Sequence, residues 1–192
     1  MGEETPGPAE TFDSFDGLVA AYEKRIFNVV YRYLGDYDEA ADVTQETFIN
    51  AYRHFNRFRG DARVFTWLYQ IAVNQCRNRV RQRDRAQQHH AESLDQPRLR
   101  SSAGGETARE VADLTHAPQT ILEAREMQRL IASAVQSLPP EYREVVLLRD
   151  MQGLSYNDIA QVSGLTLDNV KTRLSRARAM LRRKLEPYIR GG

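Results

Sequence analysis

Aromatic and basic side chains are concentrated in the stretch from Phe55 to Arg83, which reads FNRFRGDARVFTWLYQIAVNQCRNRVRQR. A single acid, Asp61, interrupts them. Aromatic faces stack on unpaired bases for about 1–3 kcal/mol per base, amides can read base edges, and arginines can hold phosphates. The composition of this stretch therefore favours contact with single-stranded nucleic acid.

The same stretch predicts a helix after Gly60 and Asp61, with two faces of different character. Apolar side chains recur at intervals of three or four along one face, at Phe65, Leu68, Ala72, Cys76 and Val80. The opposite face carries an indole, two amides and two guanidinium groups, from Trp67, Gln70, Asn74, Arg77 and Arg81. We call this second set the single-strand face. The alternative is an ordinary surface helix whose tryptophan folds back onto the core.

A helix-turn-helix pattern occupies the C-terminal part of the chain. Ser155 and Asp158 predict a capping box at the start of a short helix, and Gly164 predicts a tight turn after it. Thr166 then caps a long helix whose apolar stripe consists of Val170, Leu174, Ala177, Leu181 and Leu185. The spacing thus predicts two helices that cross at a glycine turn, as in DNA-binding proteins.

In a helix-turn-helix the second helix enters the major groove, with its N-terminal residues on base edges and the remainder near phosphates. Base edges are the expected targets of Lys171, Thr172, Ser175 and Arg176. Phosphates are the expected targets of Arg178, Arg182 and Arg183, while Arg173 lies nearer the edge of the apolar stripe. The alternatives are a basic helix for RNA or protein docking, or merely a soluble surface.

Two further amphipathic helices are predicted before the aromatic stretch. The first repeats apolar residues from Leu18 to Tyr33 and ends near Gly35. The second begins at a cap supplied by Asp36 or Asp38. Its outer side presents one exposed aliphatic residue among polar ones, at Asp42, Gln45, Glu46 and Ile49. This set, the docking face, could bind a basic helix pair, or it could be an ordinary wet surface.

The pattern of elements predicts an all-α protein with two small helical domains, the second a helix-turn-helix, joined by a flexible linker. Residues 1–14 form a tail, 15–85 the first domain, 86–118 the linker and 119–192 the second domain. The linker is assigned because apolar residues are too sparse there to make a core. A coil of this length has an end-to-end distance of roughly 30 Å and a stretched limit near 110 Å.

Charge is sorted along the chain although the net charge is only +1. Residues 1–50 hold eleven acids and three bases, whereas residues 166–192 hold eight bases and two acids. Two such poles suggest a protein partner at one end and nucleic acid at the other.

Several functional classes have no support in the sequence. The single cysteine, Cys76, excludes a disulfide framework and fits a reducing cytoplasm. Neither a membrane span nor a secretory signal is expected. The four histidines and one cysteine have no metal-ligand spacing, so we expect no metal and no cofactor. There is no P-loop and no recognisable catalytic carboxylate pair, so we do not expect an enzyme.

Two motif sets together resemble one known family, the extracytoplasmic-function (group 4) sigma factors of bacterial RNA polymerase. The resemblance covers roughly residues 15–85 and 120–188. In the first part lie D-x-x-Q-E at Asp42, F-R-G-D at Phe58 and T-W-L-Y-x-I-A-x-N at Thr66, similar to sigma domain 2. The second part, from Leu138 to Leu185, is similar to sigma domain 4.

The resemblance implies a mechanism and two main partners, core RNA polymerase and promoter DNA. The docking face would bind the coiled coil of the largest polymerase subunit. Flipped-out bases of the −10 element would be captured by the single-strand face together with a loop of Phe58, Arg59, Gly60, Asp61 and Ala62. The recognition helix would read the −35 element as duplex, about 70 Å away, which the linker can span. Such factors are commonly held by an anti-sigma protein, although no residue pattern here identifies one.

The sequence departs from the family pattern at two places. Thr166 to Asn169 stand where the family often has Pro-x-Gly-Thr, which affects the expected −35 contacts at the start of the recognition helix. Gln70 replaces a common arginine and removes one expected phosphate contact. The remaining alternative function is a polymerase-independent helix-turn-helix regulator with an N-terminal sensing or dimerisation domain.

Overall fold

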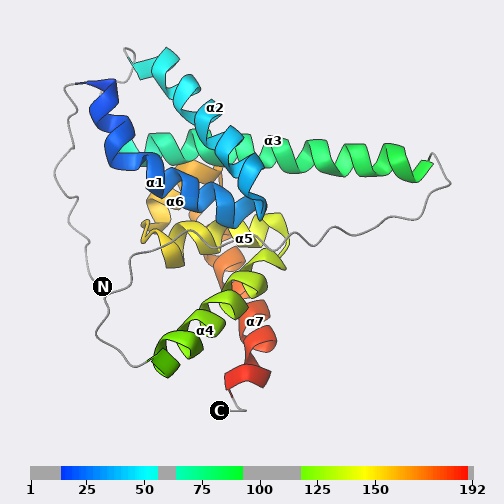
Figure 1. Cartoon of the computed structure of the whole chain (residues 1–192). Coiled ribbons are helices and arrows are strands. Elements are labelled where there is room, and N and C mark those ends of the chain that lie inside the picture. Colours follow the sequence, from blue (N-terminus) through cyan, green and yellow to red (C-terminus); the bar gives the residue numbers. More distant parts are fainter. Residues whose placement is uncertain (1–13, 56–63, 93–117, 190–192) are drawn as a thin grey trace.

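The computed structural model describes residues 14–55, 64–92 and 118–189, and the described residues are helical without a strand. The predicted all-α fold is therefore confirmed (Figure 1). The elements in chain order are α1 (Phe15–Leu34), α2 (Tyr37–Phe55), α3 (Val64–Glu92), α4 (Pro118–Gln136), α5 (Pro140–Val146), the π-helical turn η1 (Leu147–Met151), α6 (Tyr156–Ser163) and α7 (Leu167–Ile189). None of these helices is long and apolar enough to cross a membrane.

Helices α1, α2 and α3 pack together as the N-terminal half. Ser14 begins α1 by accepting a hydrogen bond from the Gly17 N–H at 3.2 Å. Gly35 ends it with φ of +79°, a left-handed conformation that glycine adopts without strain. Asp36, and not Asp38, caps α2, because its carboxylate accepts the Glu39 N–H at 2.9 Å. The predicted end of α1 at Gly35 and the predicted start of α2 at Asp36 are thus present, whereas the cap of α1 at Ser14 was not predicted.

Helices α4 to α7 form the C-terminal half. The capping box of α6 is present, since Ser155 Oγ accepts the Asp158 N–H at 3.1 Å and Asp158 Oδ2 accepts the Ser155 N–H at 3.3 Å. Gly164 follows α6 with φ of +66°. Thr166 Oγ1 accepts the Asn169 N–H at 3.3 Å at the start of α7. This half therefore has the predicted helix-turn-helix.

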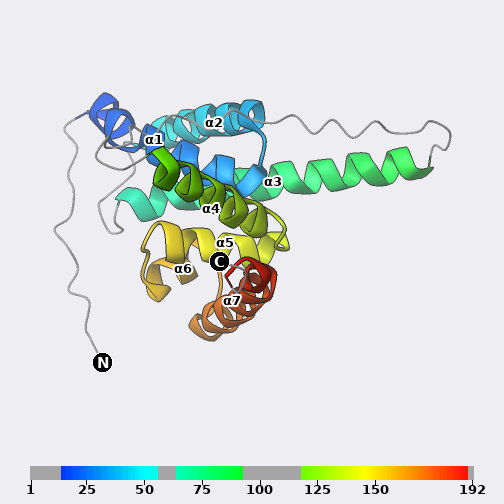
Figure 2. The same cartoon turned by 60° about the horizontal axis from the view of Figure 1, so that its bottom comes forward.

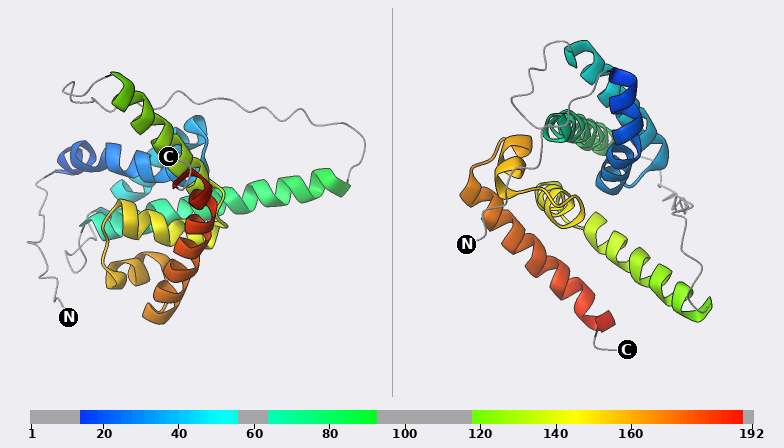
Figure 3. Two further views of the ribbon diagram at one scale, coloured as in Figure 1. Left: turned by 90° about the horizontal axis from the view of Figure 1, so that it is seen from below. Right: turned by 90° about the vertical axis from the view of Figure 1, so that its left-hand side faces the viewer.

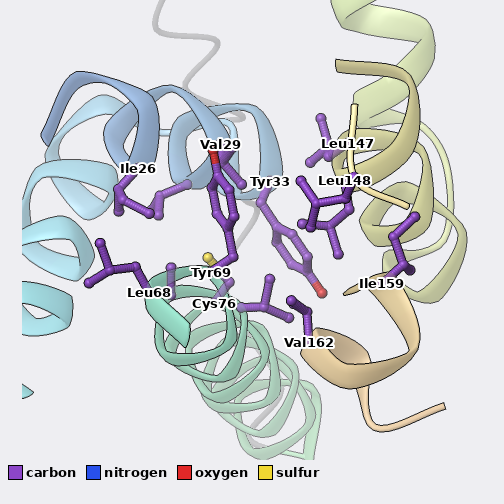
Figure 4. Close-up of a cluster of buried hydrophobic side chains, with 14 of the residues drawn as sticks. Ile26, Val29, Tyr33, Leu68, Tyr69, Cys76, Leu147, Leu148, Ile159 and Val162 are labelled. Atoms are coloured by element: carbon purple, nitrogen blue, oxygen red, sulfur yellow. The ribbon is translucent and has the colours of Figure 1, made fainter. Parts of the chain in front are cut away.

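The two halves lie against each other, as two views at right angles show (Figure 3). Their buried side chains make one continuous core, which runs from Leu18 to Ala177. In the close-up, Tyr33, Tyr69 and Cys76 of the N-terminal half face Leu148 and Val162 of the C-terminal half (Figure 4). Burial of such apolar surface contributes roughly 25 cal/mol per Å², so the contact between the halves stabilises the fold.

Polar side chains also join the halves, at the C-terminal end of α1. The last carbonyls of a helix have no partner within it. Gln136 donates to the carbonyls of Tyr31 and Arg32, and Arg143 donates to the carbonyl of Tyr33. Arg83 of α3 donates to the Leu34 carbonyl at 3.2 Å. Two guanidinium groups at this helix end also complement its negative dipole.

Helix α3 continues to Glu92, beyond the domain boundary expected at residue 85. The added residues, 86–92, are alanine, glutamine, histidine and glutamate and contain no glycine or proline, so nothing in them stops a helix. The C-terminal part of α3 extends away from the rest of the helices (Figures 1 and 2). The side chains described there, up to Gln88, are mostly exposed.

Candidate nucleic-acid interface

The single-strand face of α3 is largely open to solvent. Gln70, Asn74 and Arg81 are exposed, at intervals that place them along one side of the helix. Trp67 is half-buried and packs against the core, so its indole is partly used in packing, as the surface-helix alternative expected. Two amides and an arginine thus remain available beside a partly exposed aromatic ring.

Arg77 is the member of this face that lies at the contact between the halves. Its Nε and Nη2 donate to the two carboxylate oxygens of Glu144 at 2.8 and 2.6 Å, and Nη2 also donates to the Ser163 carbonyl at 2.9 Å. Nη1 lies 3.5 Å from Asn74 Oδ1. Burial alone would lower the pKa of Arg77, but the hydrogen bonds and charge of Glu144 outweigh it and raise that pKa above its usual value. The arginine is therefore fully charged and bidentate.

The buried side of α3 is shifted from the stripe that the sequence pattern indicated. Leu68, Ala72 and Cys76 are buried as expected, whereas Phe65 and Val80 are only half-buried. Tyr69 and Val73 are also buried, because the C-terminal half covers a flank of α3 that a single domain would leave open. Burial raises the pKa of the Cys76 thiol, so this cysteine is a neutral core residue.

The loop expected to help capture bases lies outside the described residues. It comprises Phe58, Arg59, Gly60, Asp61 and Ala62.

The docking face of α2 is a contiguous exposed surface. Asp42, Gln45, Glu46 and Ile49 are all exposed, and the isoleucine is 45 % exposed. Tyr52 lies one turn further on the same side, is 67 % exposed, and was not selected from the sequence. The signal that could have found it is its spacing of three residues from Ile49.

Glu46 is not a free acid on this face. Its carboxylate lies 3.6 Å from Arg79 Nη2 on α3, in a partly exposed ion pair of the kind that contributes about 0–1 kcal/mol. A basic partner could replace such a weak contact.

The polar face of α7 has the exposure that a recognition helix requires. Lys171, Thr172, Ser175 and Arg176 are exposed near its start, and Arg178, Arg182 and Arg183 further along. Arg173 is half-buried. Val170, Leu174 and Ala177 are buried on the other side, while Leu181 and Leu185 are half-buried. Burial of that stripe fixes the rotation of the helix, so the basic face must point outward.

Two acids touch this basic face. Asp150 of η1 accepts a hydrogen bond from Arg178 Nε at 3.2 Å, and Asp168 lies 3.4 Å from Lys171 Nζ. Both pairs are exposed and hence weak. Among the described residues, no group of three or more His, Cys, Asp and Glu side chains could hold a metal ion.

Comparison with known proteins agrees with this arrangement. Residues 18–86 match Sigma-70 region 2, and residues 128–181 match Sigma-70, region 4. The chain is 33 % identical to the RNA polymerase sigma-H factor of Pseudomonas aeruginosa over 177 residues, 92 % of this chain and 89 % of that protein. It is also 33 % identical to the ECF RNA polymerase sigma-E factor of Escherichia coli (strain K12) over 178 residues, with the same coverage.

Two solved structures share the fold. One is the sigma factor RpoE in complex with the anti-sigma factor NepR from Bartonella quintana, with a TM-score of 0.69, 23 % identity, and coverage of 90 % of this chain and 96 % of that one. The other is CnrH in complex with the cytosolic domain of CnrY, with a TM-score of 0.61, 24 % identity, and coverage of 90 % and 88 %. On the strength of the two region matches and of relatives one-third identical along nearly the whole length, the chain belongs to the extracytoplasmic-function sigma factors of bacterial RNA polymerase.

Proposed function

We propose that the chain binds core RNA polymerase in the bacterial cytoplasm and directs it to promoters, reading the −35 element as duplex and the −10 element as flipped-out single-strand bases. The observation that carries the proposal is the presence, on one chain, of two different exposed nucleic-acid surfaces. The single-strand face offers amides and a ring, whereas α7 offers a basic helix rotated outward.

The single-strand face would supply the energy for opening duplex at the −10 element. Extruding a base costs a few kcal/mol, and stacking on Trp67 with edge contacts from Asn74 and Gln70 can recover it. Arg81 would hold a backbone phosphate. Duplex opening and sequence reading then become a single step, because only bases that fit the face make contacts strong enough to offset the free energy of extruding them.

The recognition face of α7 would supply the second contact. Lys171, Thr172, Ser175 and Arg176 would read base edges, each good contact discriminating by about 1–3 kcal/mol. Arg178, Arg182 and Arg183 would hold phosphates, which adds salt-dependent affinity without sequence information, and Arg173 lies at the edge of this face.

The docking face of α2 would bind the polymerase. Asp42, Gln45 and Glu46 offer acceptors to a basic helix pair, and Ile49 with Tyr52 offers apolar area at the centre of the contact. We assign residues 15–85 to polymerase binding and −10 opening, 119–192 to −35 recognition, and 86–118 to the linker that spaces them. An anti-sigma protein is a further proposed partner.

Transcription with purified components tests the proposal. The chain is added to core polymerase on a genomic template, and the 5′ ends of the transcripts are sequenced. We expect a new set of start sites that share two sequence elements upstream. Core polymerase that initiates at the same positions with and without the chain would refute the function. A polymerase-independent regulator is not favoured, and it would instead bind a specific duplex tightly by itself.

A further inference from the structure

Arg77 belongs both to the single-strand face and to the contact between the two halves. Its neighbours on that face, Gln70, Asn74 and Arg81, are exposed. Its guanidinium, however, is directed to Glu144 of α5, whose side chain is 2 % exposed, and to the Ser163 carbonyl of α6. Ser163 Oγ donates a third hydrogen bond to Glu144, in addition to the two from Arg77. The carboxylate is thus fully enclosed by groups from both halves.

A carboxylate and a backbone phosphate can occupy the same pair of hydrogen-bond donors on a guanidinium. Both present two oxygens that match the planar fork of an arginine. Arg77 already uses Nε and Nη2 for Glu144, so a phosphate in the same plane must displace the carboxylate. Glu144 cannot stay paired with Arg77 if that arginine turns outward to bind a nucleic-acid strand, because Glu144 lies in the buried run of α5 and η1 with Val145 and Val146.

Other contacts keep the halves closed around this pair. Tyr69 of α3 donates through its hydroxyl to Gln152 Oε1 at 2.7 Å, and Thr66 Oγ1 lies 3.5 Å from Asp158 Oδ1. Tyr69 is completely buried, so its hydroxyl needs this partner in the closed chain. Of the α3 residues engaged, Arg77 belongs to the single-strand face, while Thr66 and Tyr69 precede Trp67 and Gln70 of that face in the sequence.

We propose that Glu144 is an internal competitor of nucleic-acid phosphate: in the free chain it occupies Arg77, and a single strand binds fully only when the halves separate and Arg77 exchanges Glu144 for a phosphate. This inference rests on the proposed function, because it takes the single-strand face of α3 as the surface that binds single-stranded nucleic acid. It adds a regulatory contact that the free chain makes by itself, without a second protein.

The test is binding of labelled oligo(dT) to the full-length chain without polymerase, measured by fluorescence anisotropy. Glu144→Gln keeps the shape of the side chain and removes its charge, and it should raise the affinity by about three- to tenfold. Glu141→Gln is the matched control, because Glu141 lies exposed on the same helix and the change in net charge is identical. This control should change the affinity by less than about twofold.

A double-mutant comparison separates the exchange from a general loosening of the fold. In an Arg77→Ala background the closed pair is already absent, so adding Glu144→Gln should leave the affinity unchanged. An equal gain with and without Arg77, or equal affinities for the Glu144→Gln and Glu141→Gln variants, would overturn the proposal. If Glu144→Gln fails to fold, as judged by circular dichroism, Gln152→Ala decides the matter. That variant weakens closure at Tyr69, so it should raise the affinity, and an unchanged affinity would overturn the proposal.

The outcome is separable from that of the proposed function. A wild-type chain that directs initiation with core polymerase, combined with a Glu144→Gln variant that binds oligo(dT) no better than its control, would reject the internal competitor alone. A chain that does not direct initiation at all would reject the proposed function, whatever the oligonucleotide affinities are.

Discussion

Asp150 of the π-helical turn η1 accepts hydrogen bonds from Arg178 of α7, with the Nε donor at 3.2 Å from Oδ2. Arg178 is one of the arginines to which we assign a −35 phosphate. Within the free chain its charge is therefore partly neutralised by a neighbouring acid. The pair is exposed and contributes only about 0–1 kcal/mol to folding, but a phosphate must displace the carboxylate before it can pair with Arg178.

Asp150→Asn should release Arg178 for DNA. We expect the dependence of duplex affinity on salt to steepen by about one unit of slope, because one more phosphate is neutralised. The free energy of unfolding should change by less than about 1 kcal/mol. Binding titrations at several salt concentrations give the slope. Asp38→Asn, which removes an exposed acid from α2, is the control for net charge, and an identical slope in both variants would contradict the assignment.

Asn74→Ala should impair promoter opening while leaving polymerase binding intact. Asn74 is exposed on the single-strand face and is not part of the docking face of α2. Loss of its amide removes a contact to the edge of one base. Open-complex formation should therefore fall on promoters that carry the preferred base at that −10 position, and the preference for that base should weaken. Fluorescence of promoter variants labelled in the −10 element measures opening. Unaltered opening on every −10 variant would count against the role of Asn74.

Arg176→Ala and Arg183→Ala should have different effects although both remove one exposed arginine from α7. Arg176 lies near the start of the helix, so its loss should relax −35 preference by about 1–3 kcal/mol at one position. Arg183 lies further along the helix, where we assign a phosphate contact, so its loss should weaken binding to all sequences and lower the salt slope by about one unit. Competition between matched and mismatched −35 duplexes distinguishes them. Equal losses on both duplexes for Arg176→Ala would refute its contact with bases.

Gly35→Ala should destabilise the chain more than Gly153→Ala. Both glycines have left-handed backbone, with φ of +79° and +70°, and alanine there costs about 1–2 kcal/mol. A Cβ at Gly35 would also lie 2.9 Å from Gln136 Oε1, whereas nothing lies within 4 Å of one at Gly153. Gln136 would have to move and lose its bonds to α1. Urea unfolding measures both variants, and equal losses would show that Gln136 does not press on Gly35.

Stability should fall at alkaline pH. Burial raises the pKa of the Tyr33 hydroxyl and of the Cys76 thiol above their ordinary values of 10.0 and 9.0. Both groups therefore keep their protons in the folded chain while the unfolded chain loses them. The stabilisation is complete below pH 9 and declines as the pH rises above it, by at most about 1.4 kcal/mol per pH unit for each group. Urea midpoints from pH 8 to 11 should show the decline, and Tyr33→Phe should make it shallower. A flat profile would contradict the assigned burial.

Much of the fold could be predicted from the sequence because local chemistry determines it. The capping pair Ser155 and Asp158, the glycine at position 164 and the stripe through Val170 and Leu174 each have a physical signature within a few residues. The exposure of the docking face and of the basic face of α7 was predictable for the same reason, since helical periodicity alone separates the exposed side of a helix from the buried one.

The contact between the halves could not be predicted in this way. Arg77 and Glu144 are 67 residues apart, and no local pattern indicates that they pair. Glu144 lies in an apolar run, where a charged residue usually indicates a solvent-exposed position, yet its side chain is buried. Burial of Tyr69 was missed for a related reason, because it depends on a second layer of helices and not on the period of α3.

The most direct test of the two-surface account is permanganate footprinting of a promoter located by transcript sequencing, which detects unpaired thymines. The account predicts reactive thymines in the −10 element only when the chain, core polymerase and promoter duplex are all present. Arg77→Ala and Asn74→Ala should each reduce that reactivity at an unchanged level of polymerase binding. An unreactive −10 element in the complete complex, or equal reactivity with core polymerase alone, would contradict the account.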